Sequence, residues 1–235
     1  MRPTAFLLIA TALFAQTFEV ASIKLNTSGP GPTQAPALNQ SRLTAKNSPM
    51  KWILQSAWGL SGPQVSGPAW IDADRFDIEG KAPEGVPDSE VKPMLQALLR
   101  DRFKLEAHIE MREMPVYNLV VAKDGPKIKP FDPEHPGQQP TRVPGTSMRV
   151  GGFELTQLAN ELGGTVGRPV IDKTGLQGRY FCALQYSQLG TNAPPEGAPD
   201  IFGAVQQQLG LKLEPAKAQM EVLIVDRMER TPTEN

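Results

Sequence analysis

The sequence predicts an α+β fold of two similar modules, each with two short helices packed on a small mixed or antiparallel sheet. Two observations indicate this class. Short segments with apolar residues at helical spacing alternate along the chain with short runs rich in β-branched and aromatic residues. The same order of segments also occurs twice, before and after a stretch rich in proline and glycine. Two copies are too few for a solenoid, so we expect a duplicated α+β module.

The composition limits the classes of partner. The chain has 235 residues, of which 40% are hydrophobic and 21% charged, and this is enough for one large core or two small ones. Its formal net charge is -1, and it has no long run of Lys or Arg. Domains that bind nucleic acids carry a basic patch or stripe. We therefore expect no nucleic-acid partner.

Residues 1–15 have the features of a secretory signal peptide. Arg2 gives a positive start, and residues 5–15 are apolar or small apart from Thr11. This run is shorter than the roughly 20 apolar residues that span a bilayer, and no later segment is a candidate span. A buried N-terminal helix is the alternative, but the segment has no polar face and no cap. We expect an exported chain, periplasmic or secreted, with no transmembrane segment once the signal is removed.

The N-terminal module is predicted over residues 16–124. It opens with a strand at 18–25, continues through a loop at 26–40 and reaches a short strand at 42–46. A helix follows, because apolar residues recur at the spacing of one helix face. These residues are Met50, Ile53, Leu54 and Ala57.

The second half of this module repeats the alternation of strand and helix. Short strands are predicted at 64–66 and 75–81, joined by a turn that carries two aspartates, and a helix start follows at 87–89. The apolar stripe of this helix consists of Val91, Met94, Leu95, Leu98 and Leu99. Strands at 103–110 and 116–122 are expected to pair with each other and close the module.

Residues 125–152 are predicted to form a linker or a long surface loop, and the domain boundary is placed here. Proline and glycine disfavour regular structure in this stretch. The prolines are Pro126, Pro130, Pro133, Pro136, Pro140 and Pro144.

The C-terminal module is predicted over residues 153–228, followed by a polar tail at 229–235. Its elements follow the order of the first module. They are a helix at 153–162, strands at 169–171 and 179–185, a helix from 199, and a closing strand pair of 211–215 with 220–226. Short matched segments support the repeat. They include Arg75-Phe76 with Arg179-Tyr180, Pro87-Asp88 with Pro199-Asp200, and Lys104-Leu105-Glu106 with Lys212-Leu213-Glu214.

The segment from Asp172 to Gly175 (Asp-Lys-Thr-Gly) matches the core of the P-type ATPase phosphorylation signature, in which an aspartate accepts phosphate. Here Leu176 replaces the threonine of that signature, and no downstream Gly-Asp-Gly segment supplies magnesium ligands. We interpret the segment as a turn between two strands, in which Asp172 accepts backbone hydrogen bonds and Gly175 has a positive φ.

Residues suited to catalysis or metal binding are scarce. The two histidines are His108 and His135, and the only cysteine, Cys182, lies in an apolar segment with the character of a strand. A structural zinc site takes four ligands, and a catalytic thiol takes a histidine partner in an electropositive setting. We assign no catalytic residue, no metal site and no cofactor from the sequence.

Four residues are candidate binding residues. Trp58 and Trp70 lie at the edge of the first module, where aromatic side chains suit a peptide or a glycan. The alternative, that they cap the core of that module, stays open. Arg168 and Asp172 place opposite charges on the turn of the second module.

Seven short segments of the predicted mature chain stand out together. They are Phe18–Lys24, Ala69–Asp72, Arg75–Ile78, Asp101–Leu105, Pro115–Tyr117, Gly167–Leu176 and Gln208–Glu214. In these segments the chain resembles a family of soil-associated, acidobacterial-type exported proteins classed as a domain of unknown function. The resemblance implies export and a shared fold, without an established activity or ligand. Related domains attached to membrane metallopeptidases of the antibiotic-sensor type imply a sensing or partner-binding role.

The order of elements is also similar to that of the short N-terminal modules of secretins and TonB-dependent transducers. Those modules dock other proteins, often through an exposed strand edge. The likeness is one of architecture.

We therefore expect an exported, non-catalytic module that binds a protein, a peptide or another component of the cell envelope. The alternative is an envelope hydrolase whose carboxylates or His108 come together only in space. We favour binding because the sequence motifs described above include no set of residues typical of a catalytic site.

Overall fold

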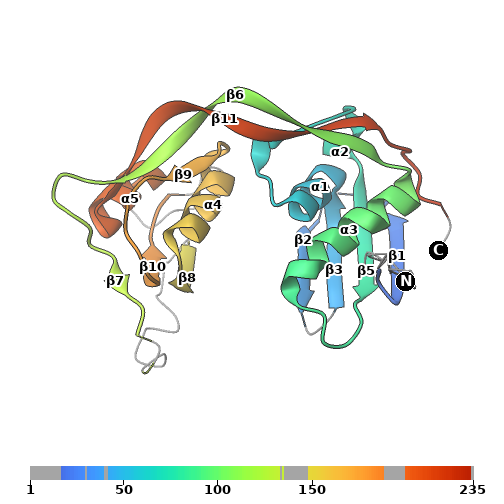
Figure 1. The fold of residues 1–235 in the computed structure, drawn as a ribbon, viewed down its shortest axis with the longest axis horizontal. Coiled ribbons are helices and arrows are strands. Elements are labelled where there is room, and N and C mark those ends of the chain that lie inside the picture. Colours follow the sequence, from blue (N-terminus) through green and yellow to red (C-terminus); the bar gives the residue numbers. More distant parts are fainter. Residues whose placement is uncertain are drawn as a thin grey trace, which may run out of the picture. The chain divides into compact units, whose positions relative to one another are not determined.

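The computed structural model describes residues 17–29, 31–39, 42–132, 134, 148–187 and 199–233. Within these ranges the chain forms five α-helices and three β-sheets, which confirms the predicted α+β class (Figure 1). The predicted signal peptide at 1–15, His135 and part of the predicted linker lie outside the described residues. The longest helix has 16 residues, and no helix in the described part of the chain has both the length and the apolar character of a membrane span.

The described residues fall into two compact units. Unit 1 comprises the residues up to Leu60, Gly67–His108 and the residues from Val225 on, whereas unit 2 comprises Ser61–Ser66 and Ile109–Ile224. The chain therefore passes between the units four times, after Leu60, Ser66, His108 and Ile224. The modules predicted at 16–124 and 153–228 are consecutive, so their boundaries differ from those of the two units.

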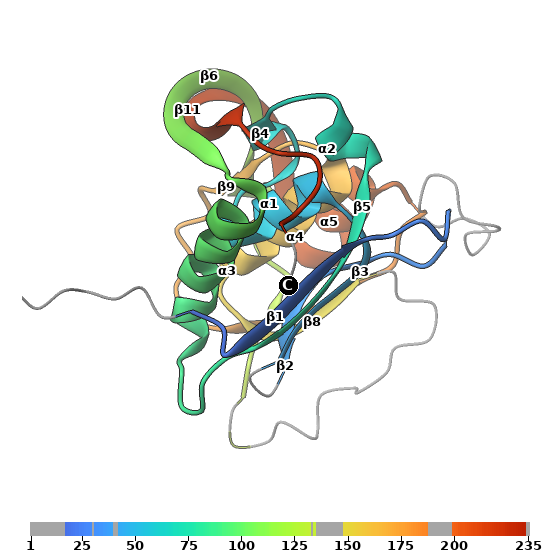
Figure 2. The same cartoon turned by 90° about the vertical axis from the view of Figure 1, so that its right-hand side faces the viewer.

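Unit 1 contains a four-stranded antiparallel sheet in the order β1-β5-β3-β2. Its strands are β1 (Val20–Leu25), β2 (Gln34–Asn39), β3 (Arg42–Pro49) and β5 (Arg75–Lys81). Helices α1 (Met50–Trp58) and α3 (Asp88–Phe103) cover one face of the sheet, and the short α2 (Trp70–Ala73) precedes β5 (Figure 2). The prediction of a loop at 26–40 is wrong for the residues of β2, which pair with β3. This is an edge strand, and an edge strand can accommodate Pro36.

The core of unit 1 lies between the helices and the sheet. Alternate residues of β5 point toward the helices, so Phe76 and Ile78 are fully buried whereas Glu79 is exposed. Phe76 packs edge-on against Phe103 of α3, with 5.3 Å between the ring centroids. Every apolar residue predicted for the stripes of α1 and α3 is buried, which confirms both helix faces.

Unit 2 contains α4 (Leu155–Val166), α5 (Ile201–Leu209) and a three-stranded sheet in the order β7-β10-β8. The strands are β7 (Lys129–Pro130), β8 (Met148–Phe153) and β10 (Tyr180–Leu184). The core joins Leu158 of α4, Cys182 of β10 and Leu209 of α5. The linker predicted at 125–152 thus contains β7 and most of β8, while residues 133 and 135–147 of it lie outside the described residues.

The third sheet has the order β4-β11-β6-β9. Its strands are β4 (Val65–Ser66), β6 (Glu106–Val121), β9 (Val170–Asp172) and β11 (Leu211–Arg227). The two closing strand pairs predicted from the sequence are wrong, because each pair is one continuous strand, β6 or β11. The residues between Glu110 and Val116 include no Gly or Asn that would favour a hairpin turn, so β6 continues as one strand. It pairs with β11.

The order of elements recurs along the chain. The series β3-α1-β4-β5-α3-β6 and β8-α4-β9-β10-α5-β11 contain the same element types in the same order. The first also contains two insertions, α2 and a 3-10 helix at Gly62–Gln64. In both series the first strand pairs antiparallel with the strand before the second helix. The short strand of each series pairs parallel with the last strand of the other. The sequence similarity of the two modules stays a prediction.

Candidate functional site

The predicted binding residues lie in both units. Trp58, at the end of α1, and Trp70, at the start of α2, are each partly buried in unit 1. The guanidinium of Arg100 lies 5.8 Å from the centre of the Trp58 ring. No hydrogen bond or ring contact in the described part of the chain joins the two tryptophans, so each sits in its own surroundings.

The turn of unit 2 uses Asp172 as a local hydrogen-bond acceptor. Its Oδ1 accepts from Thr174 N at 2.9 Å and from Thr174 Oγ1 at 2.7 Å, and Gly175 has a φ of 70°. Arg168 is exposed, and its guanidinium lies 5.6 Å from the centre of the Tyr117 ring. Within the described ranges no ion pair joins Arg168 to Asp172. The carboxylate therefore closes a turn.

Among the described residues, the cysteine is buried and one histidine contacts a carboxylate. Cys182 is fully buried, and burial raises the pKa of its thiol to about 12, so almost no thiolate exists at neutral pH. The Nδ1 atom of His108 lies 2.8 Å from Oδ2 of Asp226, and both side chains are about half exposed. No group of three or more His, Cys, Asp or Glu residues suited to a metal occurs among the described residues.

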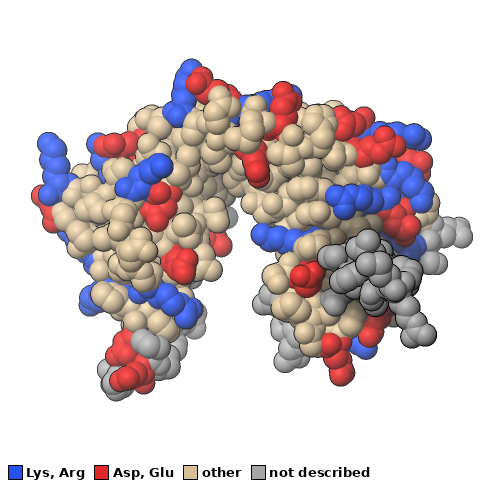
Figure 3. All heavy atoms as spheres, in the orientation of Figure 1, with Lys and Arg blue, Asp and Glu red and all other residues tan. Residues whose placement is uncertain are grey.

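Charges of both signs are mixed on one face of the molecule. On the face shown in Figure 3, Lys and Arg alternate with Asp and Glu. No field of a single sign is visible there that would attract a polyanion. On this face, a binding surface therefore has to be recognised from features other than its charge.

The outer edge of β6 is such a feature, and the backbone hydrogen bonds define which residues face it. Ala122 N donates to Gly210 O at 2.9 Å, which directs this residue toward β11. Tyr117 N donates to Pro169 O at 2.9 Å, in the direction of β9. Because backbone groups of successive strand residues point in opposite directions, the odd-numbered residues of β6 face away from β11.

The odd-numbered residues Ile109, Met111 and Glu113 therefore present their backbone groups at this outer edge. The short β9 pairs only with Tyr117, Asn118 and Leu119. No other described strand lies beside β6 on that side. Within the described part of the chain, the N–H and C=O groups of Ile109, Met111 and Glu113 thus have no strand partner.

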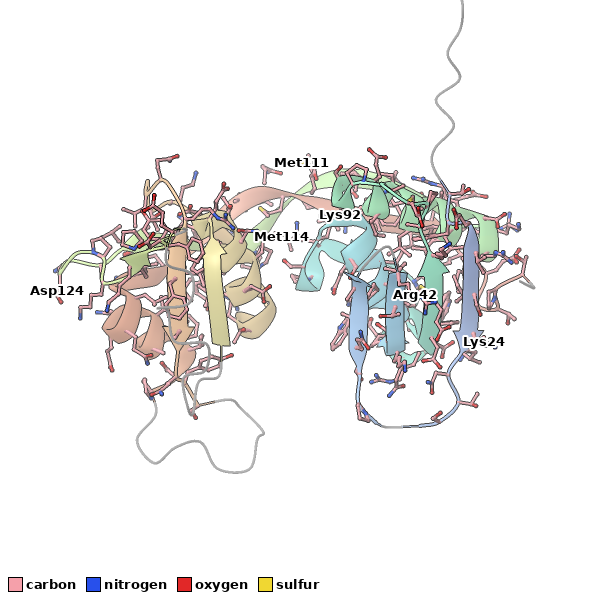
Figure 4. All side chains as sticks on the ribbon, turned by 90° about the horizontal axis from the view of Figure 1, so that it is seen from below. Lys24, Arg42, Lys92, Met111, Met114 and Asp124 are labelled. Atoms are coloured by element: carbon pink, nitrogen blue, oxygen red, sulfur yellow. The ribbon has the colours of Figure 1, made fainter. Side chains whose placement is uncertain are left out.

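The side chains along this edge include two exposed apolar residues. Ile109 is 42% exposed and Met111 is 56% exposed, the second largest fraction among the exposed large hydrophobic residues (Figure 4). The carboxylate of Glu113 pairs with Lys217 of β11 at 3.1 Å. We name the segment Ile109–Glu113 the β6 edge.

The corresponding edge of β11 is protected. It carries Pro215, which has no N–H, and the exposed charged Lys217. The carbonyl of Glu221 already accepts a hydrogen bond from Nε2 of Gln64 at 2.9 Å. Charged residues and proline are the usual means of preventing strand pairing. On the outer edge of β6, Glu113 and Pro115 give the same protection, whereas Ile109 and Met111 lack it.

Sequence reasoning missed the β6 edge. The predicted strand ended at Glu110, so Met111 fell into an expected turn. The absence of a turn residue between Glu110 and Pro115 is the signal that could have identified a single long strand.

Comparisons with known proteins identify a family of unknown function. Residues 51–228 match the family model described as "Protein of unknown function (DUF3738)". The matched range includes the β6 edge and most of both units. No curated protein and no solved structure matches the chain.

Proposed function

Because this chain belongs to the DUF3738 family of proteins of unknown function, we propose a function from its structure: it is an exported, non-catalytic binding protein. Its ligand is an extended polypeptide segment of a partner in the cell envelope, which adds as a strand to the β6 edge. The observation that carries the proposal is the unpaired backbone of Ile109, Met111 and Glu113.

The geometry of the edge specifies the class of ligand. Its outward backbone groups repeat every two residues, about 6.8 Å along the strand. Another extended polypeptide matches this spacing of donors and acceptors. Ile109 and Met111 favour a segment with apolar residues at alternate positions, and the flexible thioether of methionine adapts to different side chains.

Two features of the sequence support this proposal. The signal-like character of residues 1–15 favours a location outside the cytoplasm. The architectural likeness to secretin and TonB-dependent transducer modules favours docking through a strand edge.

One observation favours the alternative of an envelope hydrolase. The Asp226 carboxylate lies 2.8 Å from the ring of His108, and such a contact orients a histidine for general base catalysis. No hydroxyl or thiol is hydrogen-bonded to His108 in the described part of the chain, however, and both side chains are open to solvent. Binding is the better supported function.

Proline substitution tests the proposal directly. Met111→Pro removes one outward N–H from the β6 edge and leaves the donors that face β11 in place. Gln219→Pro makes the same change on the outer edge of β11 and serves as the matched control. Met111→Ala separates the contribution of the side chain from that of the N–H.

The probe is a set of extended decapeptides selected from a random display library on the full chain. We expect Met111→Pro to weaken their binding about tenfold or more, since one hydrogen bond and its register are lost, and Gln219→Pro to leave it unchanged. Hydrogen exchange should show peptide-dependent protection of the Ile109, Met111 and Glu113 amides. Equal affinity for both proline variants, with protection elsewhere, would show that the edge is not the binding site.

A further inference from the structure

Unit 1 contains a cavity, lined in part by polar side chains, that is independent of the β6 edge. It has a volume of about 450 Å³ and lies where the segment after β1 approaches β3 and β5. This volume is within the range of small-molecule sites. The side chains that line it include Asn26, Ser28, Lys46, Asn47, Asp77 and Glu79.

The cavity depends on an unusual backbone position at Asn47. Its φ is 48°, and the pairing of β3 with β5 shifts register between Ala45 and Ser48. Asn47 N donates to Oδ1 of Asp77 at 2.8 Å, and Asn47 Nδ2 donates to the carbonyl of Gly31 at 3.2 Å. These bonds hold the Asn47 side chain in a fixed orientation at the cavity.

Asn47 is only 6% exposed, yet its side-chain oxygen lacks a partner. Its Oδ1 is buried and accepts no hydrogen bond within the described part of the chain. Burying an acceptor without a donor is unfavourable. This oxygen has almost no accessible surface, so an N–H donor of a ligand reaches it only when the cavity wall shifts locally.

The two carboxylates of the cavity differ in how many hydrogen bonds they already accept. Asp77 accepts from Nδ2 of Asn26 at 2.9 and 3.0 Å and from Asn47 N. Glu79 lies two residues further on the same face of β5, is exposed, and forms no ion pair within the described ranges. The free acceptors are therefore the Glu79 carboxylate and the Asn47 oxygen.

This arrangement does not suit a metal ion. Calcium takes six to eight oxygen ligands, several of them from carboxylates. The Asp77 oxygens instead accept hydrogen bonds from N–H groups of Asn26 and Asn47. A ligand that donates hydrogen bonds and carries positive charge fits the free acceptors better.

We propose that this cavity binds an organic cation, a guanidinium or a primary ammonium group such as that of an arginine or lysine side chain. The ligand donates to the Glu79 carboxylate and to Oδ1 of Asn47. Among the described residues that line the cavity, Lys46 is the only cation, and its charge opposes the ligand.

The probes are N-acetylarginine amide, N-acetyllysine amide and N-acetylcitrulline amide, titrated into the full chain by calorimetry. Citrulline has nearly the shape of arginine without its charge, so it should bind at least about tenfold more weakly. The lysine probe distinguishes an ammonium preference from a guanidinium preference. The side-chain NH₂ signals of Asn26 and Asn47 in an NMR spectrum should shift with the arginine probe and locate it.

Four variants complete the test. Glu79→Gln should weaken arginine binding about tenfold, and Lys46→Ala should strengthen it, because one opposing charge is removed. Glu84→Gln, outside the cavity lining, is the charge-matched control and should have no effect. Asn47→Gly keeps the positive φ and removes the acceptor, so it should also weaken binding. Equal binding of citrulline and arginine, or insensitivity to Glu79→Gln, would overturn the proposal, and neither result bears on the β6 edge.

Discussion

The guanidinium of Arg230 forms two hydrogen bonds with the carboxylate of Asp74, although the residues are 156 positions apart. Nε donates to Oδ2, and Nη2 donates to Oδ1 at 2.8 Å. The Asp74 side chain is only 12% exposed. These hydrogen bonds, with the positive charge of Arg230, hold the pKa of Asp74 below its ordinary value. The segment after β11 is thereby tied to the end of α2.

This pair predicts a dependence of stability on pH. A carboxyl group whose pKa is lowered on folding contributes stability that is fully present above the unfolded pKa, about 3.9, and is lost as pH falls through the folded pKa. Asp74→Asn should therefore have a lower free energy of unfolding than wild type at pH 6. The difference should shrink below about pH 4. Urea unfolding of both proteins between pH 6 and pH 3 measures it.

Asp124→Asn is the control for this experiment, because Asp124 is an exposed loop carboxylate outside the Arg230 contact. A difference between wild type and Asp74→Asn that stays constant down to pH 3 would contradict the assigned role of Arg230.

Gly210 cannot be replaced by a residue with a side chain. Its φ is 64°, and a Cβ atom there would lie 2.2 Å from the carbonyl oxygen of Gly125. The Gly125 segment is itself held by the bond from Lys127 N to Leu209 O at 2.8 Å. We expect Gly210→Ala to lower the free energy of unfolding by about 3 kcal/mol or more, from backbone strain together with the clash.

Gly175→Ala is the matched substitution. Gly175 has a φ of 70° with open space around the Cβ position, so only the backbone strain of about 1–2 kcal/mol applies. Equal losses in the two variants, measured by urea unfolding, would show that the contact with Gly125 is easily relieved.

Cys182 should react only when unit 2 opens. The thiol is fully buried, and burial raises its pKa to about 12. Labelling with an aromatic disulfide reagent at pH 8 should therefore be slow in the folded protein and rapid in denaturant. Fast labelling of the native chain would show that α4 and β10 separate readily.

The two units should unfold together. All three tryptophans, Trp52, Trp58 and Trp70, lie in unit 1, whereas Cys182 lies in unit 2. Leu158→Ala, in the core of unit 2, should cost about 2–5 kcal/mol. Because the chain passes between the units four times, we expect this substitution to lower the midpoint of tryptophan fluorescence as well as that of Cys182 exposure.

Phe103→Ala is the reciprocal test, since Phe103 packs on Phe76 in unit 1. If each substitution shifted only the probe of its own unit, the units would be independent in unfolding.

The helices could be predicted from the sequence because their signal is local. Leu155, Leu158 and Leu162 recur at helical spacing, and all three are buried in α4 as expected. The turn at Asp172 could be predicted for the same reason, because its hydrogen bonds to Thr174 span only two residues. Both features depend on neighbours in the chain.

The pairing of β6 with β11 could not be predicted in the same way. The two strands are far apart in sequence, and the bond from Ala122 N to Gly210 O at their ends joins residues 122 and 210. Periodicity specifies that a segment is extended, but it does not specify the strand beside it.

The two proposed sites also depend on long-range structure. The β6 edge is open because β9 is short, and the cation cavity forms because a bulge brings Asn47 to Asp77, 30 positions away. No short sequence motif predicts the length of β9 or the approach of Asn47 to Asp77. Trp58 and Trp70 were predicted to be binding residues because of their side-chain chemistry. Side-chain chemistry does not indicate where the fold leaves a strand edge or a hydrogen-bond acceptor without a partner.

The interleaving of the units has a consequence for the order in which they form. Unit 1 includes the residues from Val225 on, so a chain that emerges N-terminus first cannot finish unit 1 until Arg230 has emerged. By then every residue of unit 2 is already available. During synthesis, the strand partner of Glu106–His108 is therefore supplied last, and premature arrest near residue 224 would leave that part of β6 uncovered for association with other chains.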